Sequence, residues 1–227
     1  MHQARLTCIQ LNLAHPAVRR DLADYVGLHK TLMRLATHDP DCAHPRRAAG
    51  LLFRLEHEHT TPLLYVQTTA SPQLEHLPPG YGDARTIDLA PVIHRLTPSM
   101  RVRYRIIANP STRIGKNPPR RHPGPSGRQT TPATPLRRGA VVALRGPDAL
   151  AWWHRRATQA GLAPDTTTME PRNFRRPRSA GPGPFHRLVQ FDGTALITDP
   201  QSLATALVNG IGRGQSYGAG LLSLAPA

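Results

Sequence analysis

The first hundred residues carry apolar side chains in patterns typical of strands and one helix. Residues 4–11 alternate imperfectly between apolar and polar positions but are rich in β-type side chains, which predicts a first strand. Over residues 21–37, apolar residues recur at steps of three and four, so this segment is predicted to be a helix with one apolar stripe. The residues of that stripe are Tyr25, Leu28, Leu32 and Leu35. Residues 51–57 and 63–69 are apolar runs joined by a short polar turn, which predicts a hairpin.

A second series of elements follows a Pro- and Gly-rich passage. Residues 101–110 alternate basic with apolar side chains, so one face of the predicted strand is buried and the other is strongly positive. A helix is predicted from about Pro147, and its inner residues are Leu150, Trp153 and Ala157. Two apolar runs that meet at Asp192–Gly193 predict another hairpin. The last predicted elements are a helix over 200–209 and a strand over 220–225.

The order of these elements predicts an α+β fold of two tandem ferredoxin-like (βαββαβ, RRM-like) domains. The first domain is placed at residues 1–95 and the second at residues 100–227. The second helix and the last strand of the first half are poorly marked. The prediction therefore depends on the order of the elements more than on their number.

Positive charge dominates the composition. Lys plus Arg total 29 against 14 for Asp plus Glu, which gives a formal net charge of +15. The only lysines are Lys30 and Lys116, and the planar guanidinium of Arg pairs with phosphate through two hydrogen bonds. A genome of high GC content also favours Arg over Lys, but it does not explain why acidic residues are outnumbered two to one. The charge therefore predicts a polyanionic partner.

The basic residues gather in segments that cannot form a core. Residues 115–139 hold six prolines and six basic residues and are predicted to be a mobile basic loop. The stretch 170–187 is also basic and rich in Pro and Gly. Because aromatic residues make up only 5% of the chain, base stacking cannot be extensive. The composition thus favours recognition of a structured nucleic-acid stem by charge and shape.

Several features bear on location and cofactors. Cys8 and Cys42 form no CxxC pair and have no zinc spacing, so both are expected to be free thiols in a reducing cytoplasm. The N-terminus lacks the apolar segment of a signal peptide, and no apolar run approaches the ~20 residues that span a membrane. We therefore expect a soluble cytoplasmic protein that needs no metal and no cofactor.

Two segments could carry chemistry. The C-terminal run Gly210–Gly220 contains five glycines, whose backbone amides can approach a phosphate closely, although a plain turn also collects glycine. On the predicted helix, Tyr25 and His29 are four residues apart and share one face, where a His can exchange protons near neutral pH. Core packing would explain Tyr25 equally well.

The sequence resembles a known family in three places. These are RDLADYVGLHKTL near the N-terminus, the RYRIIANP strand, and the terminal GIGRGQSYGAGLLSLAP. They resemble the CasE family, the type I-E members of the CRISPR repeat-processing endoribonucleases within the RAMP superfamily. The resemblance implies two ferredoxin-like domains, metal-independent cleavage of precursor RNA at the base of a repeat stem-loop, and retention of the product within the Cascade complex. The ribose 2′-hydroxyl would attack the scissile phosphate, leaving a 2′,3′-cyclic phosphate and a 5′-hydroxyl.

The same resemblance assigns roles to residues. It makes His29 the catalytic acid or base. It makes Tyr25 a second catalytic candidate, although the family places its Tyr three residues before the His and this chain has Val26 there. The expected partners are the repeat stem-loop and other Cascade subunits, with no membrane and a monomer when free. The expected RNA-binding residues are Lys30, Arg101, Arg103, Arg105, Arg172, Arg175, Arg176, Arg178, Gly212, Arg213, Gly214 and Gly218.

Two other interpretations stay open. The shifted Tyr is compatible with a stem-loop RNA-binding subunit that does not cleave. The basic composition is also compatible with a structural protein of a ribonucleoprotein such as the ribosome, which would bind RNA without preference for a hairpin.

Overall fold

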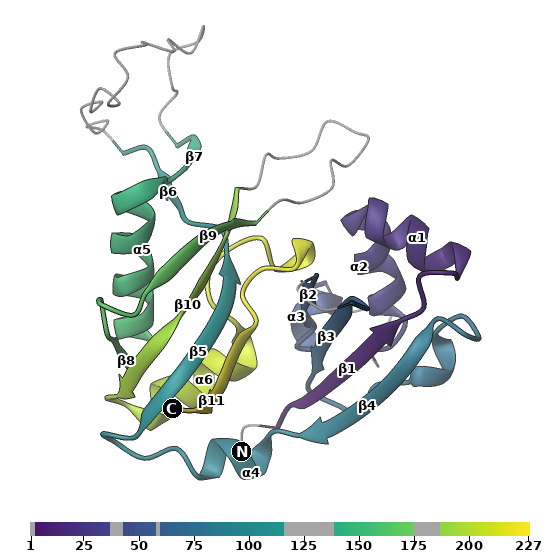
Figure 1. The fold of residues 1–227 in the computed structure, drawn as a ribbon, viewed down its shortest axis with the longest axis horizontal. Helices are drawn as coiled ribbons and strands as arrows, with labels where there is room; N and C mark the ends of the chain where they lie inside the picture. Colours follow the sequence, from purple (N-terminus) through teal and green to yellow (C-terminus); the bar gives the residue numbers. More distant parts are fainter. Residues whose placement is uncertain (1–2, 37–42, 58–59, 116–138, 175–186) are drawn as a thin grey trace, which may run out of the picture.

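The protein folds as two antiparallel sheets that lie side by side, each with helices against it (Figure 1). The computed structural model describes residues 3–36, 43–57, 60–115, 139–174 and 187–227. Among these residues, no helix is long and apolar enough to cross a membrane.

The first sheet has the strand order β2-β3-β1-β4, with every neighbouring pair antiparallel. Its strands are β1 (Arg5–Leu11), β2 (Leu52–Glu56), β3 (Leu63–Thr68) and β4 (Gly82–Asp88). The predicted first strand and the predicted hairpin are therefore confirmed. The helical elements of this half are α1 (Pro16–Ala23), α2 (Tyr25–Met33), the short α3 (Pro45–Ala48) and the 3-10 turn η1 (Leu74–His76).

The prediction of one helix over residues 21–37 is wrong, because Asp24 divides the segment. Asp24 has an extended backbone, and its carboxylate accepts hydrogen bonds from the backbone N–H groups of Val26 (3.0 Å) and Gly27 (3.1 Å). This is an N-cap, so α2 begins at Tyr25 and α1 ends before Asp24. The predicted apolar stripe is nevertheless confirmed, since none of its four residues is more than 2% exposed.

The second sheet has the strand order β11-β5-β10-β8, and β9 also pairs with β10. Its strands are β5 (Arg101–Ala108), β8 (Leu162–Pro164), β9 (Glu170–Phe174), β10 (Leu188–Ile197) and β11 (Leu222–Pro226). The remaining elements are α4 (Ala90–His94), the two-stranded pair β6 (Ser111–Arg113) and β7 (Val141–Ala143), α5 (Gly146–Gln159), α6 (Pro200–Asn209) and the 3-10 turn η2 (Gln215–Tyr217). The strand predicted at 101–110 and the helices predicted from Pro147 and over 200–209 are confirmed.

The predicted turn at Asp192–Gly193 is wrong, because β10 runs through it without a break. Gly193 serves a close approach instead: a Cβ added there would lie 2.8 Å from the hydroxyl oxygen of Tyr104 on β5. Asp192 accepts hydrogen bonds from Arg105 (2.6 Å) and Gln190 (2.7 Å). A glycine that lets two strands pack closely gives the same sequence signal as a turn glycine.

Each sheet has its own apolar core. In the first, Leu28 and Leu32 of α2 pack with Phe53 and Ile9. In the second, Trp153 of α5 packs with Phe191 at a centroid distance of 5.5 Å, within a cluster that also holds the buried residues of α6. These contacts place α2 on the first sheet, and α5 and α6 on the second.

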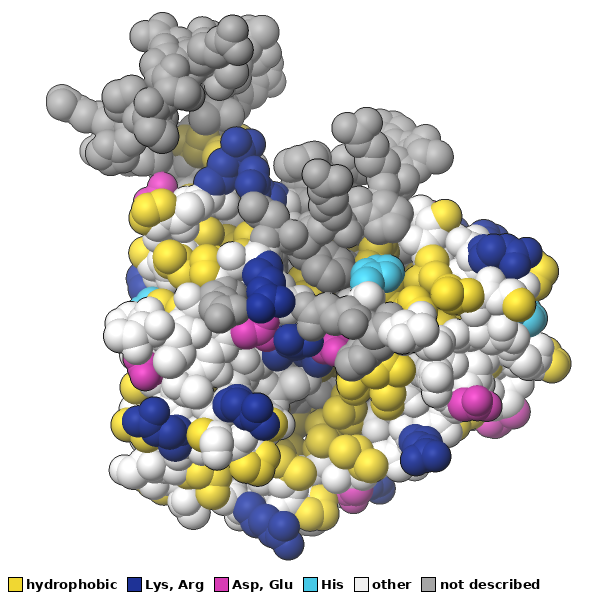
Figure 2. Space-filling view, in the orientation of Figure 1, with side chains coloured by type: hydrophobic (Ala, Val, Ile, Leu, Met, Phe, Trp, Pro, Cys, Tyr) yellow, Lys and Arg dark blue, Asp and Glu magenta, His cyan; other side chains and the backbone are white. Residues whose placement is uncertain are grey.

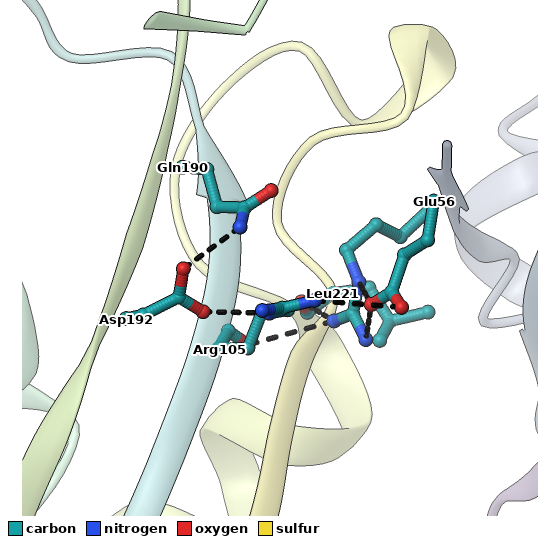
Figure 3. A network of polar contacts seen from close by, with 6 residues as sticks. Glu56, Arg105, Gln190, Asp192 and Leu221 are labelled. Atoms are coloured by element: carbon teal, nitrogen blue, oxygen red, sulfur yellow. Dashed lines mark hydrogen bonds and ion pairs between the residues drawn. The ribbon is translucent and has the colours of Figure 1, made fainter. Parts of the chain in front are cut away.

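A buried polar network joins the two halves (Figure 3). The side chain of Arg54 on β2 is only 3% exposed; it pairs with Glu56 (2.9 Å) and donates a hydrogen bond to the carbonyl of Leu221 (3.1 Å). Arg105 lies between Asp192 and Glu56, with its Nη1 atom 3.5 Å from Glu56 Oε2. The network therefore ties β2 of the first sheet to β5, β10 and the start of β11.

Candidate active site

His29 opens onto a basic pocket at one side of α2. The pocket has a volume of about 600 Å³, and its walls come from α2 and from the segment around α3. The polar residues that line it are His29, Lys30, His44, Arg46 and Arg47. The structure thus brings two of the predicted site residues, His29 and Lys30, into one pocket.

The ring of His29 is held by stacking. It lies 6.3 Å from the ring of Phe53 with an interplanar angle of 23°. Its Nδ1 atom is buried and has no hydrogen-bond partner among the described residues. The other ring nitrogen, Nε2, is therefore the one accessible from the pocket and available to exchange a proton.

The surroundings of His29 favour its neutral form. Burial lowers the pKa of His29 below its ordinary value of 6.5, and the positive charge of Arg46 lowers it further. Arg46 is itself positioned by a hydrogen bond of 3.1 Å to the carbonyl oxygen of Leu51. The lowered pKa consequently favours a neutral imidazole surrounded by cations, an arrangement suited to general-base chemistry on an anionic substrate.

Tyr25 lies beneath the site rather than in the pocket. It is 2% exposed, its ring stacks on Phe53 at 6.3 Å, and its hydroxyl oxygen is buried. The neighbouring Val26, at the position where the resembling family has Tyr, is 37% exposed. The ring of Phe53 therefore contacts the rings of both His29 and Tyr25, and Tyr25 packs against it from the core.

The glycine-rich loop reaches this stack from the second half. Gly218 has φ +79°, and a Cβ there would lie 3.2 Å from Phe53. At the other end of the loop, Gly212 has φ +84°, and a Cβ there would lie 3.2 Å from Trp152 of α5. Gly214 is also left-handed, with φ +84°. The loop thus lies against α5 at one end and against the His29 stack at the other.

The basic face of β5 forms a different pocket. Its volume is about 490 Å³, and its lining includes Arg54, Arg103, Arg105 and Asp192 but no residue of the His29 pocket. Arg101 and Arg103 are exposed, as predicted, whereas Arg105 already faces two carboxylates. On this face of the molecule, Lys and Arg side chains spread over β5, β10 and the boundary between the sheets, with acidic side chains beside the central ones (Figure 2).

The remaining predicted RNA-binding arginines fall into two groups, those that the structure describes and those that it does not. Arg172 is exposed on β9, and Arg213 is exposed on the glycine-rich loop. Arg175, Arg176 and Arg178 lie outside the described residues. Among the residues that the structure describes, no group of three or more His, Cys, Asp or Glu side chains could hold a metal ion.

Four residues of the site, His44, Arg46, Arg47 and Phe53, are not among the residues predicted from the sequence. Arg46 and Arg47 form an adjacent basic pair directly after Pro45, a signal that was present but shorter than the other arginine clusters. Phe53 follows an ordinary strand pattern, and nothing in the sequence marks it as the base of the stack. Its role depends on two long-range contacts that no local pattern reports.

Comparison with known proteins gives one consistent answer. A family profile described as CRISPR associated protein matches residues 5–226. The chain is 30% identical to the CRISPR-associated endoribonuclease Cse3 of Thermus thermophilus over 236 residues, covering 97% of this chain and 99% of that protein. It is 27% identical to the CRISPR system Cascade subunit CasE of Escherichia coli over 205 residues, covering 89% and 92%.

Solved structures agree. A structure of CRISPR endoribonuclease Cse3 bound to a 19-nucleotide RNA superposes with a TM-score of 0.75 at 28% identity, covering 98% of this chain and 100% of that one. The match in sequence and in fold thus extends over almost the whole chain, His29 and the glycine-rich loop included. The chain therefore belongs to the Cse3/CasE family of CRISPR endoribonucleases.

Proposed function

We propose that this protein cleaves CRISPR precursor RNA at the base of the repeat stem-loop, without a metal ion, and keeps the product as a Cascade subunit. The observation that carries the proposal is the His29 pocket, where an accessible imidazole nitrogen lies among Lys30, Arg46 and Arg47. The name of the Thermus relative, a CRISPR-associated endoribonuclease, supports the reaction, and the name of the Escherichia coli relative, a Cascade subunit, supports the complex. We also propose that the protein acts in the cytoplasm, because an RNA transcript is its proposed substrate.

The proposed mechanism uses the neutral form of His29. Its Nε2 atom accepts the proton of the ribose 2′-hydroxyl, and the 2′-oxygen attacks the adjacent phosphorus. The bond from phosphorus to the 5′-oxygen breaks, and solvent protonates the leaving oxygen. Lys30, Arg46 and Arg47 offset the charge that builds on the phosphate oxygens in the transition state. The products carry a 2′,3′-cyclic phosphate and a 5′-hydroxyl.

Tyr25 stays a catalytic candidate by resemblance, but its burial favours a different contribution. A hydroxyl inside the core reaches the RNA only if the stack on Phe53 opens. We therefore propose that Tyr25 holds Phe53, and through it His29, in place.

We also propose that each sheet with its helices is a ferredoxin-like domain, as expected for residues 1–95 and 100–227. The strand orders β2-β3-β1-β4 and β11-β5-β10-β8 support this, because each puts the first strand of its half between the last strand and the strand that precedes the last one. The second half has a helix in both connections, α5 and α6, whereas the first has only η1 between β3 and β4. The monomeric state of the free chain stays a prediction that gel filtration tests.

The second candidate is a stem-loop-binding subunit that does not cleave. The observation that favours it is the buried hydroxyl of Tyr25 at the position shifted from the family pattern. The two functions differ in one outcome, which is scission of the RNA.

Incubation of the protein with a labelled repeat stem-loop in EDTA tests the proposal. We expect one cut, a cyclic phosphate on the upstream product, and no cut when the nucleotide before the cleavage site is 2′-deoxy. Tight binding of the hairpin without any cut would establish the second candidate instead. A requirement for a divalent ion, or cleavage of the 2′-deoxy RNA, would refute the mechanism.

A further inference from the structure

A second basic pocket lies on the second half, away from His29. Its volume is about 320 Å³, and it is formed by β6, α5 and the glycine-rich loop, with no residue in common with the His29 pocket. Its lining residues include Arg113, Trp152, Arg155, Arg156, Gln159 and Arg213.

This pocket concentrates charge without compensation. Among the residues that the structure describes, four guanidinium groups line the pocket and no carboxylate does. Within the part of the chain that the structure describes, none of the four forms an ion pair, in contrast to Arg54 and Arg105 at the junction of the halves. Like charges held close together repel one another, and a bound anion removes that cost while it gains charge-assisted hydrogen bonds.

Contacts of the fold position the side chain of Arg156 and the backbone next to Arg213. Arg156 donates a hydrogen bond of 3.1 Å to Gln159, and its guanidinium lies 5.8 Å from the ring centre of Trp152. Arg213 follows Gly212, which the absence of a Cβ allows to pack on the same Trp152 ring.

The glycine-rich loop links this pocket to the cleavage site. Arg213 lies near one end of the loop, and Gly218, near the other end, packs on Phe53 beneath His29. The loop thus lines this pocket through Arg213 and contacts the core beneath His29 through the buried Gly218, so one short segment connects the two basic pockets.

We propose that the pocket formed by Arg113, Arg155, Arg156 and Arg213 binds backbone phosphates of the same RNA, away from the phosphate that is cut. The proposal rests on the proposed function and adds a second contact site to it. Guanidinium groups match phosphate oxygens, and the hydroxyl-bearing Ser111 and Thr112 line the same wall. Among the described residues that line the pocket, Trp152 is the only aromatic one. It is 4% exposed and the guanidinium of Arg156 lies over its ring, so neither face of the ring is free to stack on a base. The pocket therefore senses charge and not base identity.

The test compares two double variants that remove equal charge. Arg113→Gln/Arg155→Gln alters the pocket, and Arg85→Gln/Arg95→Gln removes two exposed arginines that lie in none of the pockets described above. Affinity for the repeat RNA is measured between 50 and 300 mM KCl in the His29→Ala background, which prevents cleavage during the measurement. We expect the pocket variant to bind about tenfold more weakly at low salt, with the slope of log K against log salt reduced by roughly 1 to 2.

The outcomes separate this proposal from the proposed function. A pocket variant that binds like the control pair, within twofold at every salt concentration, overturns the second site, whereas failure of the His29→Ala parent to bind the stem-loop overturns the proposed function. Repeating the measurement with the stem alone and with the stem plus its flanks identifies which phosphates are held. A loss on the stem alone assigns the pocket to the duplex backbone, and a loss seen only with flanks assigns it to the single strand.

Discussion

Substitution Arg54→Met removes one partner from the buried network that joins the two halves. The side chain of Arg54 is 3% exposed and that of Glu56 is 7% exposed, so the substitution leaves a carboxylate in a site from which water is largely excluded. Breaking such a pair by removing one partner costs about 3–5 kcal/mol. Arg105 still lies 3.5 Å from Glu56 and partly compensates the negative charge of that carboxylate. We therefore expect a cost at the lower end of this range, about 3 kcal/mol.

Urea unfolding followed by tryptophan fluorescence measures this cost, because Trp153 is fully buried in the second core. For a chain of this size, a loss of about 3 kcal/mol lowers Tm by roughly 6–12 °C. The matched control is the double variant Arg54→Met/Glu56→Met, which removes both charges and is expected to recover most of the lost stability. The role given to the pair would be refuted if Arg54→Met cost less than about 1 kcal/mol. It would also be refuted if the double variant lost as much stability as Arg54→Met and Glu56→Met lose separately, added together.

Three further predictions concern the cleavage site. Because the pKa of His29 is lowered, its neutral form persists below pH 6.5. The second-order rate constant for cleavage should therefore fall on acidification with an apparent pKa under 6.5. A fall centred above that value would contradict a neutral base. Tyr25→Phe should keep the cleavage rate within about threefold of the unmodified protein. Tyr25→Ala should lower the free energy of unfolding in urea by about 3–5 kcal/mol. A hundredfold loss of rate in Tyr25→Phe would show that the hydroxyl takes part in the chemistry. Gly218→Ala should destabilise the protein by about 1–3 kcal/mol and slow cleavage, since it combines a left-handed backbone with contact on Phe53. Gly139→Ala is the control for the backbone cost, as it has φ +86° with nothing within 4 Å, and equal effects at both positions would remove the case for loop packing.

The sequence predicted the elements whose signals are local. The stripe of α2, the hairpin of β2 and β3, and the alternation along β5 all follow from periodicity, because side-chain spacing alone decides which face is buried. The errors came where one residue type serves two purposes. Asp24 falls inside the predicted helix although its carboxylate caps one, and Gly193 falls in a predicted turn although it makes room for Tyr104.

The candidate site was predictable only in part. The family resemblance identified His29, and its neighbour Lys30 proved to line the same pocket. Arg46, Arg47 and Phe53 were missed because they meet His29 only through the tertiary fold. The arginines of β5 lie on one face, as the alternation predicts. Arg105, however, forms ion pairs with Asp192 and Glu56, which no pattern along one strand could reveal.

The most direct test of the account is single-turnover cleavage of the repeat stem-loop by the unmodified protein and by His29→Ala, with binding measured for both. We predict that the variant loses at least a hundredfold in rate at saturating protein, while its affinity changes by less than about threefold, because His29 moves a proton and the surrounding cations hold the RNA. A variant that still cleaves at a comparable rate once the RNA is saturated would contradict the assignment of His29 and of its pocket as the active site.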